Sequence, residues 1–159
     1  MKAYLSRRYH LSASHRLHTE SYSAEQNKTV YGKCNHPHGH GHNYVVEVKM
    51  SGAVDPVTGM VCNLGHLDEF IKREIVEQFD QTNLNLNARF ARLVPTTENF
   101  CVEIYNIVRS GFHHAVLEKV RVEETSNNFF EYAGPINLGT GNLSTGNLST
   151  AKFNTGGTL

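Results

Sequence analysis

Residues 39–50 of this chain read GHGHNYVVEVKM. The run from Asn43 to Met50 is rich in β-branched and aromatic residues and is followed by a Ser-Gly pair, which predicts a β-strand. His40 and His42 stand two positions apart where this strand begins, so their side chains leave the same face of the chain. The strand therefore presents a pair of histidines at its start.

Apolar patterns elsewhere predict strands and helices around this segment. The polar stretch from Thr19 to Lys28 is expected to be a loop or a short helix. The order of two strands, two helices and two strands indicates an α+β fold with an antiparallel sheet. The predicted elements are strands 2–15, 43–50, 118–124 and 128–132 and amphipathic helices 67–79 and 100–112, the second helix with its N-cap at Thr96 or Thr97.

The overall composition indicates one soluble domain. The chain has 159 residues, of which 39% are hydrophobic, which is enough for one core. Its 15 basic and 15 acidic side chains balance, so no field of one sign favours a nucleic acid or an anionic membrane as partner. No apolar stretch approaches the ~18 residues of a membrane span. Three cysteines, an odd number, and a start without an apolar secretory segment favour the cytoplasm.

The composition changes after Gly134. Residues 135–159 are dominated by Gly, Asn, Ser and Thr, and the sequence TGNLS occurs twice, at 140–144 and 145–149. Such a segment has too few bulky apolar residues to offset the entropy lost on ordering. We therefore expect one folded domain over residues 1–134 and a mobile tail over 135–159. The tail can instead add an edge strand in an oligomer.

Histidine is over-represented, with ten in the chain and four between residues 36 and 42. Catalytic zinc sites use three protein ligands and leave one position for water or substrate. His40 and His42 offer two such ligands from one strand face, and the adjacent glycines let the backbone approach closely. A solvated His-rich loop that binds metal adventitiously explains the same composition about equally well. His36 and His38 are spare by count.

Three motifs, in order along the chain, together resemble those of a known family: LSASHRL at 11–17, GKC at 32–34 and GHGHNY at 39–44. The family is that of the 6-pyruvoyl-tetrahydropterin synthases, and the similarity covers residues 2–134. It implies a T-fold, in which an antiparallel sheet with two helices on one face closes with two copies of itself into a barrel. Two such trimers stack as a hexamer, with active sites between subunits. Shorter matches lie at 55–60, 80, 83–84, 95–99, 124–125 and 127–128.

The resemblance also implies the chemistry of the site. It adds His15 to His40 and His42 as the third ligand of a Zn²⁺ cofactor, and it makes Cys34 the proton-transfer base. The implied substrate is 7,8-dihydroneopterin triphosphate, which loses triphosphate to give 6-pyruvoyl-tetrahydropterin. Cys62 and Cys101 stand within apolar patterns and are expected to be buried, inert thiols.

Substrate contacts follow from the same resemblance. Glu124 corresponds to the carboxylate that anchors the amino-pyrimidine edge of the pterin, a surface that a carboxylate complements. Glu98, with Thr96 and Thr97, corresponds to a second pterin-contacting group, although the same residues suit helix capping. Phosphate needs cationic or N–H donors. The candidates for the triphosphate are Arg7, Arg8, Arg16, Lys33 and Lys49.

The chain departs from the family at one position of the catalytic machinery. In the family an Asp-His pair tunes the base, but here Asp80 is followed by Gln81, and a glutamine cannot shuttle a proton. Either a histidine elsewhere takes its place, or turnover is slow, or the chain favours a related pterin reaction. The candidate replacements are His36, His38, His113 and His114.

Alternative functions remain open from the sequence. Cys34 precedes His40 by six positions, as in the biopterin-pathway enzymes, whereas the 6-carboxy-tetrahydropterin synthases of the queuosine pathway place the cysteine four positions before the first zinc histidine. His38 stands at that shorter spacing. The strand directly after His42 favours alignment on His40 and His42, and so the pyruvoyl enzyme. A zinc-holding pterin-binding protein and a metal-sequestering module with no need of His15 are the non-catalytic alternatives.

Overall fold

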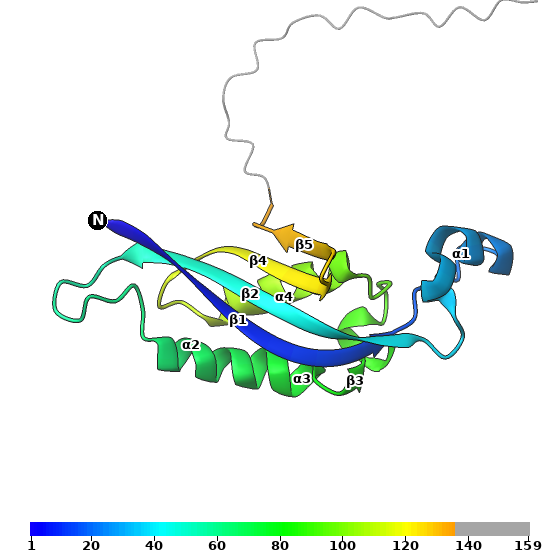
Figure 1. Ribbon diagram of the computed structural model, residues 1–159, viewed down its shortest axis with the longest axis horizontal. Helices are drawn as coiled ribbons and strands as arrows, with labels where there is room; N and C mark the ends of the chain where they lie inside the picture. The colour runs from blue at the N-terminus through cyan, green and yellow to red at the C-terminus, as the bar shows by residue number, and fades with distance from the viewer. Residues whose placement is uncertain (136–159) are drawn as a thin grey trace, which may run out of the picture.

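The computed structural model describes residues 1–135, in which a five-stranded sheet carries three helices, α2, α3 and α4, on one face (Figure 1). The strand order is β3-β1-β2-β4-β5, and each neighbouring pair is antiparallel except β3 with β1. The predicted α+β class is confirmed. The strands are β1 (Lys2–His15), β2 (His40–Ala53), β3 (Thr82–Asn83), β4 (Val116–Thr125) and β5 (Asn128–Tyr132), and the α-helices are α1 (Ala24–Tyr31), α2 (Leu64–Ile71), α3 (Glu77–Phe79) and α4 (Thr97–Gly111).

The two longest strands, β1 and β2, pair in register along their whole length. His15, the last residue of β1, lies opposite His40, the first residue of β2, and Ala13 lies opposite His42. Because paired residues and residues two apart on a strand share a face, all three histidines project from the same side of the sheet. β2 begins three residues before the predicted Asn43, since the histidine segment already pairs with β1.

This side of the sheet is also its apolar side. Val46, Val48, Val120 and Val122 are fully buried beneath the helices. The opposite face of the sheet is charged and carries ion pairs between neighbouring strands. Arg8 Nη2 lies 2.8 Å from Glu123 Oε2, for example. The core therefore lies between the sheet and helices α2 to α4, and the histidines stand at one end of it.

The predicted helix 67–79 is interrupted by a π-helical segment, η2 (Lys72–Val76), between α2 and α3. Ile71, Ile75 and Phe79 recur every four residues and are all fully buried. In a regular α-helix, with 3.6 residues per turn, this spacing drifts by about 40° at each step. The wider π turn takes up the drift and keeps the three side chains on the core.

The second predicted helix is α4, and its N-cap is Thr96. The Thr96 hydroxyl accepts a hydrogen bond from the Asn99 N–H at 3.2 Å. Thr97 is the first helical residue and is buried. The cap of α4 therefore brings Thr96, Thr97 and Glu98 to the end of the sheet at which the histidines lie.

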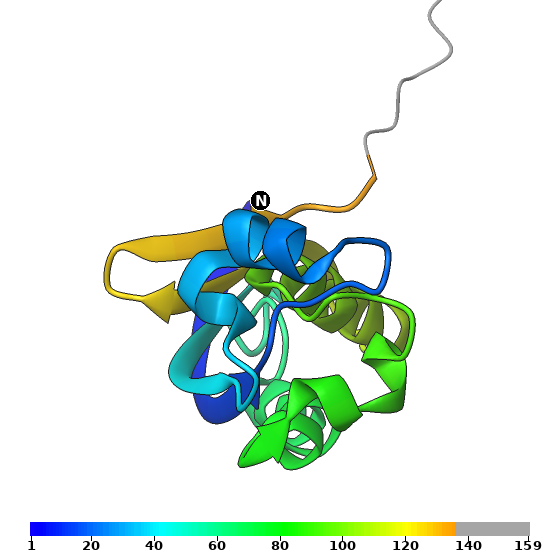
Figure 2. The same ribbon diagram turned by 90° about the vertical axis from the view of Figure 1, so that its right-hand side faces the viewer.

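The segment between the two long strands contains a helix rather than a loop. α1 begins with a capping box, in which Ser23 and Gln26 bond each other's backbone N–H groups. A 3₁₀ turn, η1 (Gly32–Asn35), follows it and contains Cys34. α1 lies beyond the end of β1 and the start of β2 (Figure 1) and faces the viewer in Figure 2.

Other segments complete the description. Residues 81–87, predicted only as a polar break, contain β3 and the 3₁₀ turn η3 (Leu84–Leu86), and η4 (Ala88–Phe90) follows. Apart from residue 135, the predicted tail lies outside the described residues. Within residues 1–135, no helix is both long enough and apolar enough to cross a membrane.

Candidate functional site

Three histidines converge where β1 ends and β2 begins. The ligand atoms of His15, His40 and His42 all lie within 4.8 Å of one another. His15 Nε2 lies 3.2 Å from His40 Nε2, and the His15 ring meets both other rings edge to face. Three convergent imidazoles form a donor set that suits a transition-metal ion.

The orientation of His15 also suits metal binding. Its Nδ1 lies 2.8 Å from the carbonyl oxygen of Pro95, an oxygen that can only accept, so Nδ1 carries the hydrogen. Nε2 is then the free lone pair, and it points at the other two histidines. This arrangement, with one ring nitrogen tied to a backbone carbonyl and the other facing the metal position, is typical of metal-ligating histidines.

The electrostatic environment keeps these ligands neutral. Burial lowers the pKa of His15, which is 1% exposed, and burial is also the main cause of the lowered pKa of His42. His42 Nε2 is buried and has no hydrogen-bond partner among residues 1–135. A buried nitrogen without a partner is costly unless something else occupies its lone pair. The residues present therefore fit a bound metal ion.

Glu124, on β4, lies next to the histidines. Its Oε1 is 3.6 Å from His15 Nε2 and 3.5 Å from His42 Nε2, and its Oε2 accepts a hydrogen bond from Asn128 Nδ2 at 2.9 Å. The Glu124 side chain is 15% exposed. A carboxylate in this position places negative charge between the metal-binding histidines and the adjoining pocket.

That pocket has a volume of about 310 Å³ and lies between α1, the start of α4 and strands β4 and β5. Cys34 and Glu124 line it from opposite parts of the chain. Five of the sequence-predicted site residues thus share one cavity with aromatic walls. Its lining includes Cys34, Thr96, Thr97, Glu98, Glu124, Tyr31, Phe129 and Phe130.

The Cys34 thiol is partly buried, and its pKa is raised by burial and by the negative charge of Glu124. Cys101 is fully buried, and burial raises its pKa to about 12, as an inert core thiol requires. Cys62 is only partly buried. The expectation of a buried thiol therefore holds for Cys101 and is wrong for Cys62, because the short segment before α2 lies at the surface.

Asp80 and Gln81 do not line the Cys34 pocket. Asp80 Oδ1 accepts a hydrogen bond from the Ser12 N–H at 2.7 Å, and the Gln81 N–H donates to the Ser12 carbonyl at 2.6 Å. Gln81 has a φ of 56°, in the left-handed region. It lines a different, open pocket of about 490 Å³ on the other side of β1, together with His42 and Asn43.

The other histidines occupy separate places. His36 and His38 pack against each other, with ring centroids 5.6 Å apart, in the exposed loop before β2. His114 pairs with His66 at 5.6 Å in a pocket between α2 and the end of α4, and His113 lines a pocket beside Val116. Neither His113 nor His114 lines the Cys34 pocket of the same subunit.

Sequence patterns did not single out three contributors to this site. Tyr44 is fully buried, with its hydroxyl 3.5 Å from His15 Nδ1, and burial raises its pKa. The Pro95 carbonyl orients His15, and Asn35 anchors the turn that carries Cys34. Tyr44 follows the His pair directly, which is a usable signal, whereas a backbone carbonyl leaves no mark in a sequence.

Comparisons with known proteins agree with this geometry. The sequence profile described as 6-pyruvoyl tetrahydropterin synthase matches residues 4–135. A human protein named 6-pyruvoyl tetrahydrobiopterin synthase is 45% identical over 134 residues, which cover 84% of this chain and 92% of that protein. An Archaeoglobus fulgidus protein named putative 6-carboxy-5,6,7,8-tetrahydropterin synthase is 34% identical over 112 residues, 70% of this chain and 88% of its own.

The similarity extends to three dimensions. The structure of Caenorhabditis elegans 6-pyruvoyl tetrahydropterin synthase superposes with a TM-score of 0.81 at 39% sequence identity. It covers 85% of this chain and 97% of its own. The five-stranded sheet and the helices on one of its faces are therefore shared with a solved structure.

Proposed function

The chain belongs to the 6-pyruvoyl tetrahydropterin synthase family, and from that membership we propose that it is a zinc-dependent lyase. It converts 7,8-dihydroneopterin triphosphate to 6-pyruvoyl-tetrahydropterin and triphosphate, a step of tetrahydrobiopterin synthesis. The observation that carries this proposal is the convergence of His15, His40 and His42 beside a pocket that contains both Cys34 and Glu124.

Zinc is proposed as the metal, held by His15, His40 and His42. Three neutral imidazoles with room for a further ligand are the donor set of catalytic zinc. When bound, zinc supplies Lewis-acid polarisation of substrate oxygen atoms. The protein's own contribution is to keep the imidazoles neutral by burial and to hold His15 through the Pro95 carbonyl.

Cys34 is proposed as the base that takes a proton from the substrate side chain, after which triphosphate leaves by elimination. Only the thiolate can accept the proton. Glu124 and burial oppose that charged form, so cationic groups brought to the pocket are needed to favour it. The thiol is therefore expected to ionise in the loaded site rather than in the metal-free protein.

Pterin recognition is assigned to the same pocket. Glu124 can accept two hydrogen bonds from an amino-pyrimidine edge, and Phe129 and Phe130 offer aromatic surface to the ring. Thr96, Thr97 and Glu98 line the same cavity at the positively polarised start of α4. The triphosphate then needs cations close to Cys34.

Ion pairing narrows the candidates for triphosphate binding. Arg7 forms a bidentate pair with Asp68, and Arg8 pairs with Glu123. Arg16 contacts the Asn35 carbonyl at 3.2 Å and so stands beside the Cys34 turn, and Lys33 is the exposed neighbour of Cys34. Arg16 and Lys33 are therefore the proposed phosphate contacts.

The site is proposed to lie between subunits of a hexamer built as a dimer of trimers. Asp80 and Gln81 line the far side of β1 from Cys34, so they can act on a Cys34 only if it belongs to another copy. β1 is paired by β3 at two positions only, which leaves most of its outer edge open to another strand. Closure across copies would remove that edge.

A second candidate is the 6-carboxy-tetrahydropterin synthase reaction. It is favoured by the similarity to the Archaeoglobus fulgidus protein of that name and by His38, four positions after Cys34. The higher identity to the human protein and the use of His40 and His42 in the histidine cluster favour the pyruvoyl reaction. A weakened zinc- and pterin-binding homologue is the third outcome that Gln81 leaves open.

The test is to incubate zinc-loaded protein with 7,8-dihydroneopterin triphosphate and to identify the products by mass spectrometry, in parallel with the Cys34→Ala variant. Cys34-dependent 6-pyruvoyl-tetrahydropterin together with free triphosphate supports the proposal. A 6-carboxy product assigns the chain to the second candidate. Zinc and pterin binding without any product refutes an active synthase.

A further inference from the structure

The turn that carries Cys34 has little to hold it in place by packing. η1 is a single 3₁₀ turn, and none of its four residues, 32–35, is buried. Its preceding residue, Tyr31, provides no side-chain cap. A short exposed turn of this kind is held by hydrogen bonds rather than by a core, so the partners of Cys34 and Asn35 determine where the thiol lies.

Those partners come from the segment directly after His15. The Leu17 N–H donates to the Cys34 carbonyl at 2.8 Å, and Asn35 Nδ2 donates back to the Leu17 carbonyl at 2.7 Å. The two bonds run in opposite directions between the same two pieces of chain. They join the Cys34 turn to the strand that ends in a metal-binding histidine, two residues before Leu17.

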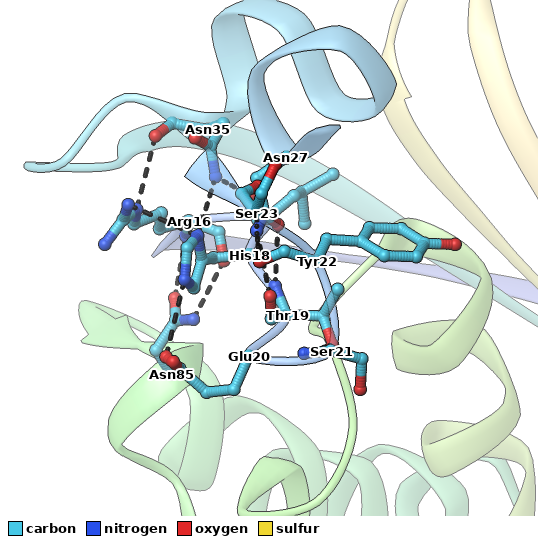
Figure 3. Close-up of polar contacts among 11 residues, drawn as sticks. Arg16, His18, Thr19, Glu20, Ser21, Tyr22, Ser23, Asn27, Asn35 and Asn85 are labelled. Carbon is cyan, nitrogen blue, oxygen red and sulfur yellow. Dashed lines mark hydrogen bonds and ion pairs between the residues drawn. The ribbon is translucent and has the colours of Figure 1, made fainter. Parts of the chain in front are cut away.

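Asn35 also contacts a second group, His18 (Figure 3). Asn35 Nδ2 lies 3.1 Å from His18 Nδ1, and Arg16 Nη2 lies 3.4 Å from the same nitrogen. Amide and guanidinium nitrogens only donate, so His18 Nδ1 accepts and the ring is neutral. The remaining ring nitrogen, Nε2, faces the Glu20 carboxylate at 3.4 Å.

Arg16 closes the arrangement and is itself held from the opposite side. Its Nε donates to the Asn35 carbonyl at 3.2 Å. Its backbone is clamped by Asn85, whose Oδ1 accepts from the Arg16 N–H at 2.7 Å and whose Nδ2 donates to the Arg16 carbonyl at 2.8 Å (Figure 3). The Cys34 turn is therefore tied to a segment that is fixed in turn to η3.

We propose that Asn35 and His18 are positioning residues for Cys34: they hold its turn against the end of β1, so that the thiol keeps one place in the pocket relative to the three histidines. This inference rests on the proposed function, in which Cys34 is the base. Asn35 uses both amide hydrogens, one on Leu17 and one on His18. His18 supplies the acceptor that fixes the amide's second hydrogen.

The experiment compares three variants with the parent hexamer or whatever oligomer the zinc-loaded protein forms. Asn35→Ala removes both bonds of the amide. His18→Leu removes the acceptor, and His18→Asn returns an acceptor near the former position of Nδ1. Asn87→Ala is the matched control, because Asn87 caps η4 through its side chain but lies outside the Cys34 pocket.

Two readouts separate positioning from general stability. Peptide-resolved alkylation with iodoacetamide compares Cys34 with Cys62, which is also partly buried but lies far along the chain, so their ratio cancels global effects. Steady-state kinetics with 7,8-dihydroneopterin triphosphate gives kcat and KM. Zinc per subunit is measured in every variant, because His15, His40 and His42 are unchanged.

We expect Asn35→Ala to raise the Cys34-to-Cys62 alkylation ratio about fivefold and to lower kcat about tenfold with little change in KM or zinc, since a misplaced group costs turnover. His18→Leu changes both quantities in the same direction, and His18→Asn restores them. A ratio and a kcat within twofold of the parent in both Asn35→Ala and His18→Leu overturn the proposal, and so does loss of activity that only follows loss of zinc.

Failure of the proposed function gives a different pattern. If the parent protein makes no product, the lyase assignment fails on its own, and the alkylation ratio still decides whether Asn35 and His18 hold the Cys34 turn. If the parent turns over but the ratio and kcat do not respond to the variants, the lyase assignment stands and the positioning role is wrong.

Discussion

The ring of His15 and the carbonyl of Pro95 meet at 2.8 Å, and this contact joins the metal-binding cluster to the start of α4. Pro95 directly precedes the N-cap Thr96, so the residue that orients a ligand also sets where the helix begins. The pocket residues Thr96, Thr97 and Glu98 are thus placed by the same short segment that fixes His15. Metal binding and substrate binding share one structural support.

Removal of His15 tests the metal centre. We expect His15→Ala to weaken zinc binding at least about 100-fold, since even loss of a ligand's supporting contact costs 10- to 100-fold. The measurement is zinc per subunit after dialysis against a weak chelator. The paired variant His36→Ala/His38→Ala is the control and should keep its zinc. Retention of zinc in His15→Ala with loss in the control would instead indicate the adventitious His-rich loop.

The pKa shifts of the buried histidines predict how the stability of the metal-free protein depends on pH. The pKa values of His15 and His42 are lowered from 6.5 in the folded chain, so below pH 6.5 the unfolded chain binds more protons. The free energy of unfolding should therefore decrease as the pH falls through 6.5, by at most about 1.4 kcal/mol per pH unit for each histidine.

Urea unfolding of the metal-free protein between pH 7.5 and pH 5 measures this dependence, and the protein in excess zinc provides the comparison. A His15→Gln variant should show a shallower slope over the same interval. Equal slopes for the two metal-free proteins would mean that His15 is not held neutral by the fold.

Glu124 is predicted to have two separable effects. Its charge helps to raise the pKa of the Cys34 thiol, so Glu124→Gln should lower that pKa in the metal-free protein. The pH dependence of Cys34 alkylation measures the shift. Glu98→Gln, in the same pocket, is the matched control. An unchanged or higher thiol pKa in Glu124→Gln would contradict the electrostatic assignment.

The same variant should lose activity even though its thiol is easier to ionise. Without a carboxylate for the amino-pyrimidine edge, kcat/KM for 7,8-dihydroneopterin triphosphate should fall about tenfold or more, as for the loss of a charge-assisted hydrogen bond. Full activity in Glu124→Gln would remove Glu124 from the proposed recognition site.

Gln81 is predicted to limit turnover. Gln81→His should raise kcat about tenfold or more, because a positioned proton-transfer group contributes roughly 10²-fold to 10⁴-fold. The left-handed φ of 56° tolerates histidine and asparagine better than most residues. Gln81→Asn is therefore the control: it suits the backbone but cannot carry a proton. A Gln81→His enzyme no faster than Gln81→Asn would show that this chain has no need of an imidazole there.

Much of this architecture could be predicted from the chain itself. The histidine pair at the start of β2 follows from two-residue spacing, and Thr96 was one of two expected caps for α4. Both signals are local, because strand alternation and capping depend on a few neighbouring residues. His15 gave no local signal of comparable strength, and only the resemblance to a family brought it to the other two histidines.

The remaining features depend on distant contacts. β3 pairs with β1 at only Ala13 and Ser14, and no pattern in its two residues marks a strand. The π turn was hidden in the four-residue spacing of Ile75 and Phe79, which also fits a regular amphipathic helix. Packing against the sheet decides between the two geometries, and that packing cannot be read from the helix sequence alone.

The π turn of residues 72–76 makes the position of Asp80 and Gln81 depend on a count of residues. A π turn holds one residue more than the α-helical turn it replaces, so deletion of one residue there would turn the rest of the helix by about 100°. Phe79 would leave the core, and Asp80 would lose the Ser12 N–H. Among relatives of this chain, single-residue gaps in this helix would therefore re-aim the loop more drastically than any substitution within it.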